Sequence, residues 1–208
     1  MRYPPGHKEE RRRELLKASG ALVKERGFAA SGVDALTEAA GVTSGAFYSH
    51  FTSKNDLLKA LVESELRASN ERWAANPHET AEDWIGYELD RYLSMSHVRH
   101  PEAGCVLPAL GAEIARADGE VKEAYARELA KGIDILTRRL GDKDRAWAFL
   151  CQMAGAILLA RTMPDQKSQL ALIESSKRFL QEAFNGRSEA ASMKKASTAK
   201  RKSPAPRQ

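Results

Sequence analysis

The sequence predicts an all-α protein. Ala, Leu, Glu, Lys and Arg dominate its 208 residues, and apolar residues recur at steps of three and four, as they do on one face of a helix. Sustained alternation of apolar and polar residues, the signal of a half-buried strand, is missing from the sequence. We therefore expect helices throughout, divided from one another by Gly, Pro and capping residues.

The first three expected helices lie close together in the chain. The first spans about residues 8–26 and ends at Gly27. Ser31, with Asp34 three residues later, has the spacing of a capping box at the start of the second. The second ends at Gly41, where the chain must turn sharply. The three helices cover about residues 8–26, 32–40 and 44–50.

Six longer helices are expected to follow. Ser53 and Thr80, each with an Asp three residues later, mark the starts of the fourth and fifth. Pro108 is tolerated only in the first turn of the sixth. Gly141 and Pro164 precede the last two helices. The six cover about residues 54–75, 80–97, 106–116, 120–140, 143–161 and 166–185.

Asn185 and Gly186 are expected to end the last helix, and residues 187–208 form a tail with almost no large apolar residue. Such a segment cannot bury enough surface to offset its ordering entropy, so we expect a disordered basic tail. Residues 186–208 hold 7 Lys and Arg against 1 Asp or Glu, and residues 1–60 hold 10 against 7. The basic ends of the chain favour a polyanionic partner.

Composition also indicates the compartment. No stretch approaches the roughly 18 consecutive apolar residues that a membrane helix needs, and the charged N-terminus lacks the apolar segment of a signal peptide. The only cysteines are Cys105 and Cys151, too few for a disulfide-stapled secreted domain. We expect a cytoplasmic protein with reduced thiols and no membrane partner.

Residues 35–54, ALTEAAGVTSGAFYSHFTSK, read as a helix, a tight turn and a second short helix. Thr43 and Ser44 place hydroxyls and free backbone N–H groups at the start of that second helix, where a phosphate can bind. Gly45 and Ala46 are small enough to lie against base edges or thymine methyl groups. The side chains expected to reach phosphates are those of Tyr48, His50 and Lys54.

Residues 10–60 resemble the DNA-binding domain of the TetR family of regulators. The matching motifs are Gly27-Phe28, AAGVTSGAFYSHF across the turn, and SKNDLL at the fourth helix. Gly32 and Ser44 depart from the pattern, since a hydroxyl residue and a basic residue are frequent there. The resemblance implies phosphate contacts from Ser31 or its neighbour, Thr43, Tyr48, His50 and Lys54, and base readout by Ser44, Gly45 and Ala46. A helical hairpin of another all-α protein, with Phe47 and Tyr48 as core, is the alternative.

The resemblance also implies domains and a function. A helix-turn-helix DNA-binding domain would span residues 1–54, and a helical ligand-sensing and dimerisation domain residues 55–186. The implied protein is a homodimeric regulator of transcription, a repressor released from a palindromic double-stranded DNA operator by a small apolar or electrophilic effector. Neither a cofactor nor a metal is expected.

The last two long helices are expected to pair with those of a second subunit, because apolar residues follow one side of each. The alternative is that these residues serve only the core of one chain. The candidate interface residues are Trp147, Leu150, Ala154, Ile157, Leu158 and Arg161 on the first helix, and Leu170, Ile173, Lys177, Leu180 and Phe184 on the second.

Effector sensing is expected near residues 104–118, which resemble a subgroup of the family with Gly-Cys before the sixth helix. At a helix N-terminus the pKa of the Cys105 thiol would be lowered and its thiolate made reactive toward electrophiles. A cysteine that packs as a small hydrophobe is the alternative. Residues expected to line a pocket, unless they are plain core, are Trp84, Tyr87, Tyr92, Leu107, Trp147 and Met153.

Two other functions compete with this interpretation. An enzyme is disfavoured, because paired Glu-x-x-His motifs, a nucleotide-binding loop and a nucleophile elbow are all missing from the sequence. His97 and His100 lack a carboxylate or cysteine at ligand spacing, so we expect no metal. A non-specific architectural DNA-binding protein, driven by the basic tail, stays open as the second alternative.

Overall fold

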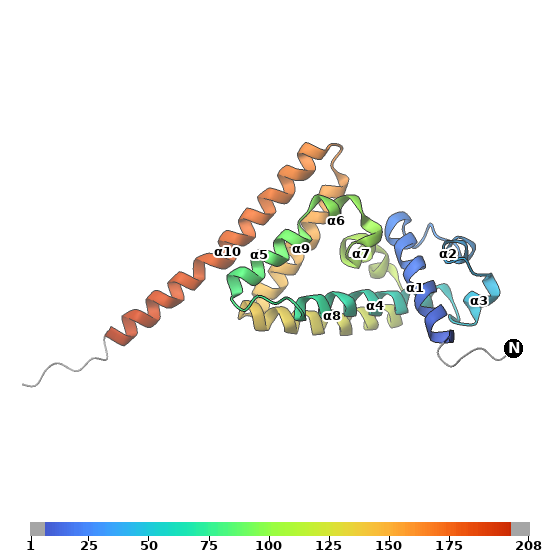
Figure 1. Cartoon of the computed structure of the whole chain (residues 1–208), viewed down its shortest axis with the longest axis horizontal. Helices are drawn as coiled ribbons and strands as arrows, with labels where there is room; N and C mark the ends of the chain where they lie inside the picture. Colours follow the sequence, from blue (N-terminus) through green and yellow to red (C-terminus); the bar gives the residue numbers. More distant parts are fainter. Residues whose placement is uncertain (1–6, 201–208) are drawn as a thin grey trace, which may run out of the picture.

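The computed structural model describes the backbone of residues 7–200 and the side chains of residues 8–184, and in this part every regular element is a helix. Figure 1 shows α1 to α3 together at one end, α4 and α8 side by side along one edge, and α9 and α10 at the other end. The elements are α1 (His7–Arg26), α2 (Val33–Ala39), α3 (Ser44–Tyr48), α4 (Lys54–Ala74), α5 (Ala81–Tyr92), α6 (Met95–Arg99), the 3-10 turn η1 (Pro101–Ala103), α7 (Val106–Arg116), α8 (Gly119–Leu140), α9 (Lys143–Thr162) and α10 (Gln166–Lys200).

Side-chain caps begin several helices where the sequence predicts them. The Ser53 hydroxyl accepts the N–H of Asp56 at 3.0 Å, and the Thr80 hydroxyl accepts the N–H of Asp83 at 3.1 Å. The capping box predicted at Ser31 is wrong. Its hydroxyl donates to a carbonyl of the preceding turn, and Gly32 caps α2 without a side-chain bond, so the start of α2 is fixed by the loop rather than by a cap.

Two predicted boundaries are wrong for physical reasons. The helix predicted over residues 80–97 is divided into α5 and α6, because the Ser94 hydroxyl accepts the N–H of His97 and starts a new helix. The helix predicted to end at Gly186 continues to Lys200. One glycine costs a helix only about 1 kcal/mol, and the Ala- and Lys-rich residues after it favour helix. The predicted tail beyond residue 200 lies outside the described residues.

Two apolar clusters hold the helices together. One cluster contains side chains from the four helices α1, α2, α3 and α4 and from the inner faces of α7 and α8. It includes the fully buried Leu36, Phe47 and Leu57. The other lies among α5, α8, α9 and α10 around Trp84 and Phe149. Because α7 contributes to the first cluster, the helix-turn-helix does not pack as a separate unit but rests on the helices that follow it.

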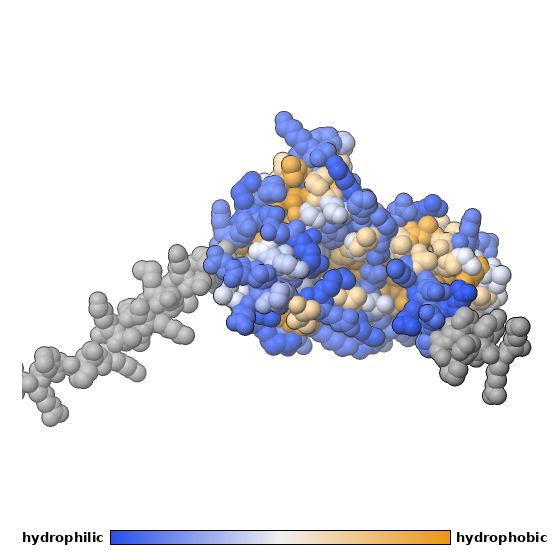
Figure 2. Space-filling model, viewed as in Figure 1, coloured by the Kyte–Doolittle hydropathy of each residue, from blue (hydrophilic) through white to orange (hydrophobic). Residues whose placement is uncertain are grey.

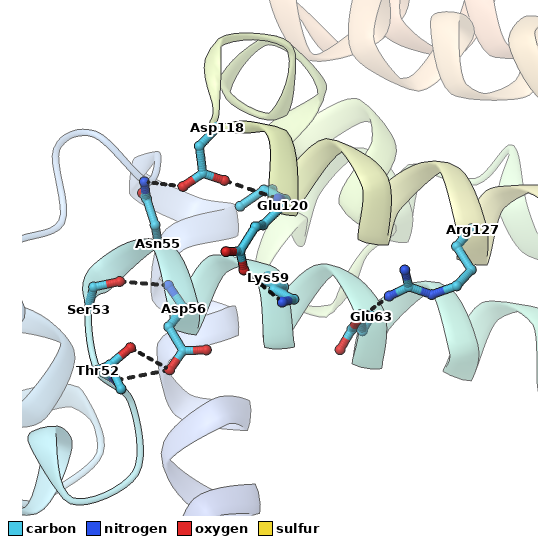
Figure 3. A network of polar contacts seen from close by, with 10 residues as sticks. Thr52, Ser53, Asn55, Asp56, Lys59, Glu63, Asp118, Glu120 and Arg127 are labelled. Atoms are coloured by element: carbon cyan, nitrogen blue, oxygen red, sulfur yellow. Dashed lines mark hydrogen bonds and ion pairs between the residues drawn. The ribbon is translucent and has the colours of Figure 1, made fainter.

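α4 and α8 run alongside each other and connect the two ends of the molecule. Gly132 of α8 makes the close approach possible, since a Cβ there would lie 2.5 Å from Oδ1 of Asn70 on α4. Polar pairs continue this contact toward the start of α4, as Figure 3 shows. The pairs are Asn55 with Asp118 at 2.8 Å, Lys59 with Glu120 at 2.9 Å and Glu63 with Arg127 at 2.6 Å.

In the part of the chain that the structure describes, no helix is both long and apolar enough to cross a membrane. The same residues contain no group of three or more His, Cys, Asp or Glu side chains that could hold a metal ion.

The link between α6 and α7 depends on the imidazole of His97. Its Nδ1 donates to the carbonyl of Tyr92 at 2.8 Å, and its Nε2 accepts the N–H of Cys105 at 2.9 Å. Both bonds require the neutral ring with its hydrogen on Nδ1. Burial lowers the pKa of His97 to about 4, although the bond to Tyr92 acts in the opposite direction. Three nearby cations also lower it, namely Arg161 of α9, Arg91 of α5 and Lys24 of α1.

This link predicts a pH dependence of stability. Because the unfolded chain has the ordinary pKa of 6.5, it binds more protons than the folded one between pH 6.5 and about 4. The free energy of unfolding should therefore be fully retained above pH 6.5 and fall below it, with a slope approaching about 1.4 kcal/mol per pH unit from this group. Urea unfolding at pH 7 and pH 5 measures the fall. His97→Gln should reduce it and His100→Gln, at an exposed site, should not; an unchanged slope in His97→Gln contradicts the assignment.

Candidate nucleic-acid interface and effector pocket

One face of α3 packs against the core of the chain, and the other face is exposed. At its start the Thr43 hydroxyl accepts the N–H of Ala46 at 3.2 Å. The side chain of Phe47 is fully buried, with its ring 5.7 Å from that of Phe51 and edge-on to Tyr48 at 5.2 Å. Although α3 is only five residues long, these contacts fix its orientation, which a helix that enters a DNA groove requires.

The structure places most predicted DNA contacts on the outer side of α3 and the turn before it. Tyr48 is 59% exposed. The hydroxyl of Ser44 lies 3.4 Å from a carboxylate oxygen of Asp34, a charge that disfavours a phosphate at that hydroxyl. The exposed residues are Thr43, Ser44, Gly45 and Tyr48, and the half-buried ones are Ala46, His50 and Lys54.

Ser31 does not lie on this surface. It is only 2% exposed, and its hydroxyl donates to the carbonyl of Gly27 at 2.7 Å. Gly27 has a φ of +88°, so the chain folds back between α1 and α2 and directs Ser31 inward. The predicted phosphate contact from Ser31 is therefore corrected, and its exposed neighbour Gly32 offers only backbone atoms.

Of the predicted phosphate contacts, Lys54 already has a partner within the chain, whereas His50 lies near other charged side chains. Lys54 donates to the carbonyl of Phe28 at 2.5 Å and lies 4.3 Å above the ring of that residue, and burial lowers its pKa. Burial also lowers the pKa of His50, and the positive charges of Lys8 and Arg12 lower it further. Lys8 and Arg12 therefore place positive charge near His50, beside the negative charge of Glu9, and the two cations suit a phosphate neighbour even when the ring itself is neutral.

A groove of about 470 Å³ lies between α1 and α3, with Arg11 on its α1 side and Thr43 and His50 on the other. Arg12 lies close by, with its guanidinium 4.9 Å from the centre of the Phe51 ring. The basic run Arg11–Arg13 of the sequence thus has two members beside α3, which adds positive charge where a DNA backbone would pass.

A polar cavity of about 340 Å³ lies among α4, α5, α6, η1 and the start of α7. Cys105 and Tyr92 are the only residues of the predicted lining that it contains. The polar residues of the cavity wall were not predicted from the sequence, because the prediction relied on aromatic residues, whose pattern is the same in a pocket and in a core. Clustered Arg, Ser and His residues are the signal that indicates a polar site. The main side chains around it are Arg72, Trp73, Arg91, Tyr92, His97 and Cys105.

Five residues predicted to line a pocket lie elsewhere. Trp84 and Met153 are fully buried in the core, and Tyr87 and Trp147 are 44% and 39% exposed on the outside. Leu107 packs against both apolar clusters. These five residues therefore do not line the polar cavity, contrary to the sequence prediction.

Cys105 caps α7 and is buried at the cavity wall. Burial raises the pKa of its thiol, and this outweighs the Tyr92 hydroxyl and the N–H of Leu107, which lower it. The lowered pKa expected at a helix N-terminus is therefore corrected, since desolvation of the thiolate exceeds the effect of the helix dipole. Cys151, by contrast, is exposed on α9.

The cavity is connected to the helix-turn-helix by one buried cation. Nζ of Lys24, on α1, donates to both carboxylate oxygens of Glu65 at 3.0 Å and to the carbonyl of Gly104 at 3.1 Å. Gly104 lines the cavity and precedes Cys105. A second link joins the N–H of Ala29, after α1, to Glu113 of α7 at 2.7 Å. A shift of η1 or α7 therefore moves α1 as well.

Large apolar side chains lie exposed on α9 and α10. Figure 2 shows hydrophobic surface near the end where these two helices meet. Of the residues predicted for an interface, Leu150, Ile157, Ile173 and Leu180 are instead buried in the core of the chain. Trp147, Leu158 and Leu170 of the predicted set are exposed, and two residues that were not predicted, Leu159 and Phe179, are exposed as well.

The amino-acid sequence of the first third of the chain matches known regulators. Residues 15–61 match the family described as bacterial regulatory proteins, tetR family. The HTH-type transcriptional repressor KstR2 of Mycobacterium tuberculosis is 38% identical over 61 residues, 29% of this chain and 30% of that protein. The HTH-type transcriptional activator FasR of Mycolicibacterium smegmatis is 38% identical over 59 residues, 28% of this chain and 27% of that protein. The match thus spans about 30% of the length of the curated relatives.

The fold of the described chain is also that of solved regulators. A TetR family regulator from Agrobacterium tumefaciens superposes with a TM-score of 0.73 at 18% identity, covering 86% of this chain and 99% of that one. Reduced NemR of E. coli superposes with a TM-score of 0.70 at 21% identity, covering 82% and 95%. The chain therefore carries the N-terminal helix-turn-helix domain of the TetR family and has the overall fold of that family's regulators.

Proposed function

We propose that this protein is a cytoplasmic, homodimeric transcriptional regulator that binds a palindromic operator and, acting as a repressor, leaves it when a small effector binds. The observation that supports this most is the connection from α1 to the polar cavity. Lys24 bonds to Gly104 at the cavity wall and belongs to the helix that packs against α2 and α4. A ligand that changes the wall can therefore change the orientation of α3.

DNA reading is assigned to the exposed end of α3. Gly45 and Ala46 would lie nearest to base edges, and the hydroxyls of Thr43 and Tyr48 would meet phosphates. Five residues of helix can contact only a few base pairs, so specificity requires a second head. Two heads about 34 Å apart would read the two halves of a palindrome on one side of the duplex.

The second subunit is assigned to the exposed apolar face of α9 and α10. Side chains such as Leu158, Leu159 and Phe179 lose water contact if the same pair of helices from a second copy packs against them. Such a four-helix arrangement satisfies the two-fold symmetry that a palindromic site demands.

An electrophile is a second class of effector, as the Gly-Cys sequence at residues 104–105 suggests. The Cys105 thiol lies at the wall of a cavity that reaches the surface at Arg72 and His100, so a small reagent has a path to it. Its raised pKa keeps most of the thiol protonated at neutral pH, which argues for slow modification rather than instant capture.

Selection of bound duplexes from a random pool tests the proposed function, and Gly45→Asp then tests the role of α3. A Cβ at Gly45 would make only an ordinary contact with Oγ1 of Thr43, 3.9 Å away, so the variant should fold, but its carboxylate would face the bases and phosphates. We expect affinity for the selected duplex to fall at least about 100-fold by fluorescence anisotropy, a loss of roughly 3 kcal/mol. Gly111→Asp, at a site on α7 with open space around it, is the control. Equal binding by the two variants would exclude α3 from the interface.

Truncation after Gly186 separates a sequence-specific regulator from an architectural protein. The removed segment holds 7 Lys and Arg against 1 Asp or Glu. We expect the truncated protein to keep its preference for the selected duplex over an unrelated one, with lower affinity for both and a smaller dependence on salt. Competition binding at two salt concentrations measures this. Loss of the preference would favour the architectural protein instead.

A further inference from the structure

We propose that the polar cavity is a binding site for a small organic anion, whose acidic group is held at Arg72 and Tyr92 while its apolar part lies against Trp73. The assignment gives the chemical class of the effector in the proposed function, and only its consequence for DNA rests on that function.

The charge of the residues that line the cavity is the first reason to expect an anion there. The titratable side chains of the cavity are Arg72, Arg91, His97, His100, Tyr92 and Cys105, and no carboxylate residue is among the residues that line it. Arg91 is neutralised from behind by the buried Glu88. The guanidinium of Arg72 bonds only to the hydroxyl of Ser69, at 2.9 Å, among the described side chains. Arg72 thus leaves an uncompensated positive charge at the cavity mouth, which favours an anion.

The second reason is a buried polar group in the cavity wall, the hydroxyl of Tyr92. The side chain of Tyr92 is 4% exposed and lines the cavity, and its hydroxyl lies near the weakly accepting thiol of Cys105 but makes no well-formed hydrogen bond in the described part of the chain. A buried donor without a partner costs about 1–3 kcal/mol, so the site gains when a ligand oxygen accepts that hydrogen. The buried Nε of Arg161, beside Gly104, also lacks a partner there and adds positive charge behind the wall.

The remaining surface limits the size and shape of the ligand. The volume of about 340 Å³ is at the lower end of the range for small-molecule sites. Trp73 and Tyr92 provide aromatic faces, so an anion with a ring or a short chain is favoured over a bare inorganic ion. Such a ligand would also contact Gly104, whose carbonyl holds Lys24.

Direct binding to the full-length protein tests the site, with benzoate as the probe. Isothermal titration should show benzoate binding, and benzamide, its neutral isostere, should bind at least about tenfold more weakly. Phenyl phosphate distinguishes a carboxylate site from a phosphate site, and tighter binding of either anion supports the proposal. Equal binding of benzoate and benzamide, or no binding of either anion at 10 mM, would overturn it.

Three variants locate the binding site. Binding of the tighter of the two anions should weaken at least about tenfold in Arg72→Gln and about threefold in Tyr92→Phe. Arg67→Gln, at an exposed arginine outside the cavity on the same helix, should leave this binding unchanged. Anion binding that is unchanged in Arg72→Gln would overturn the assignment. The titration contains no DNA, so its result does not depend on the duplex selection. The anion site and the proposed function can therefore fail independently of each other.

Discussion

The ammonium group of Lys24 is the interaction on which the arrangement of this molecule most depends. Its side chain is 5% exposed, and it bonds to Glu65 of α4 and to the carbonyl of Gly104. A buried cation requires such partners, because an uncompensated charge in the protein interior is strongly unfavourable. The position of α1 is therefore fixed relative to α4 and to η1 at the same time, and neither can shift without disturbing the charge.

This constraint explains why the helix-turn-helix and the polar cavity are packed together as one structure. α3 is held by Phe47 in a cluster that also contains Val106 and Leu110 of α7. α7 begins at Cys105, whose N–H is held by His97 at the cavity wall. Packing and hydrogen bonds thus run without interruption from the cavity to α3, while α4 and α8 give this path a rigid support.

Much of the fold could be predicted from local signals, because helix caps and turns act over a few residues. Ser53, Thr80, Gly41 and Gly141 set boundaries as expected. The wrong predictions concern residues whose positions depend on contacts between segments far apart in the sequence. Whether Trp84 lies in the core or at a pocket depends on which helices surround it, and the sequence pattern is the same in both cases. Lys24 reads as an exposed helical residue, and only the fold brings Glu65 and Gly104 to it.

The most direct test of the Lys24 connection is amide hydrogen exchange of the full-length protein with Lys24→Met, measured beside Lys17→Met, a change at an exposed site on the same helix. Without the ammonium group, Glu65 and the carbonyl of Gly104 lose their shared donor. We expect at least about tenfold faster exchange in Lys24→Met, both in residues 15–61 and around Gly104, and no change in Lys17→Met. Protection of residues 15–61 that is the same in Lys24→Met as in the unsubstituted protein would contradict this expectation.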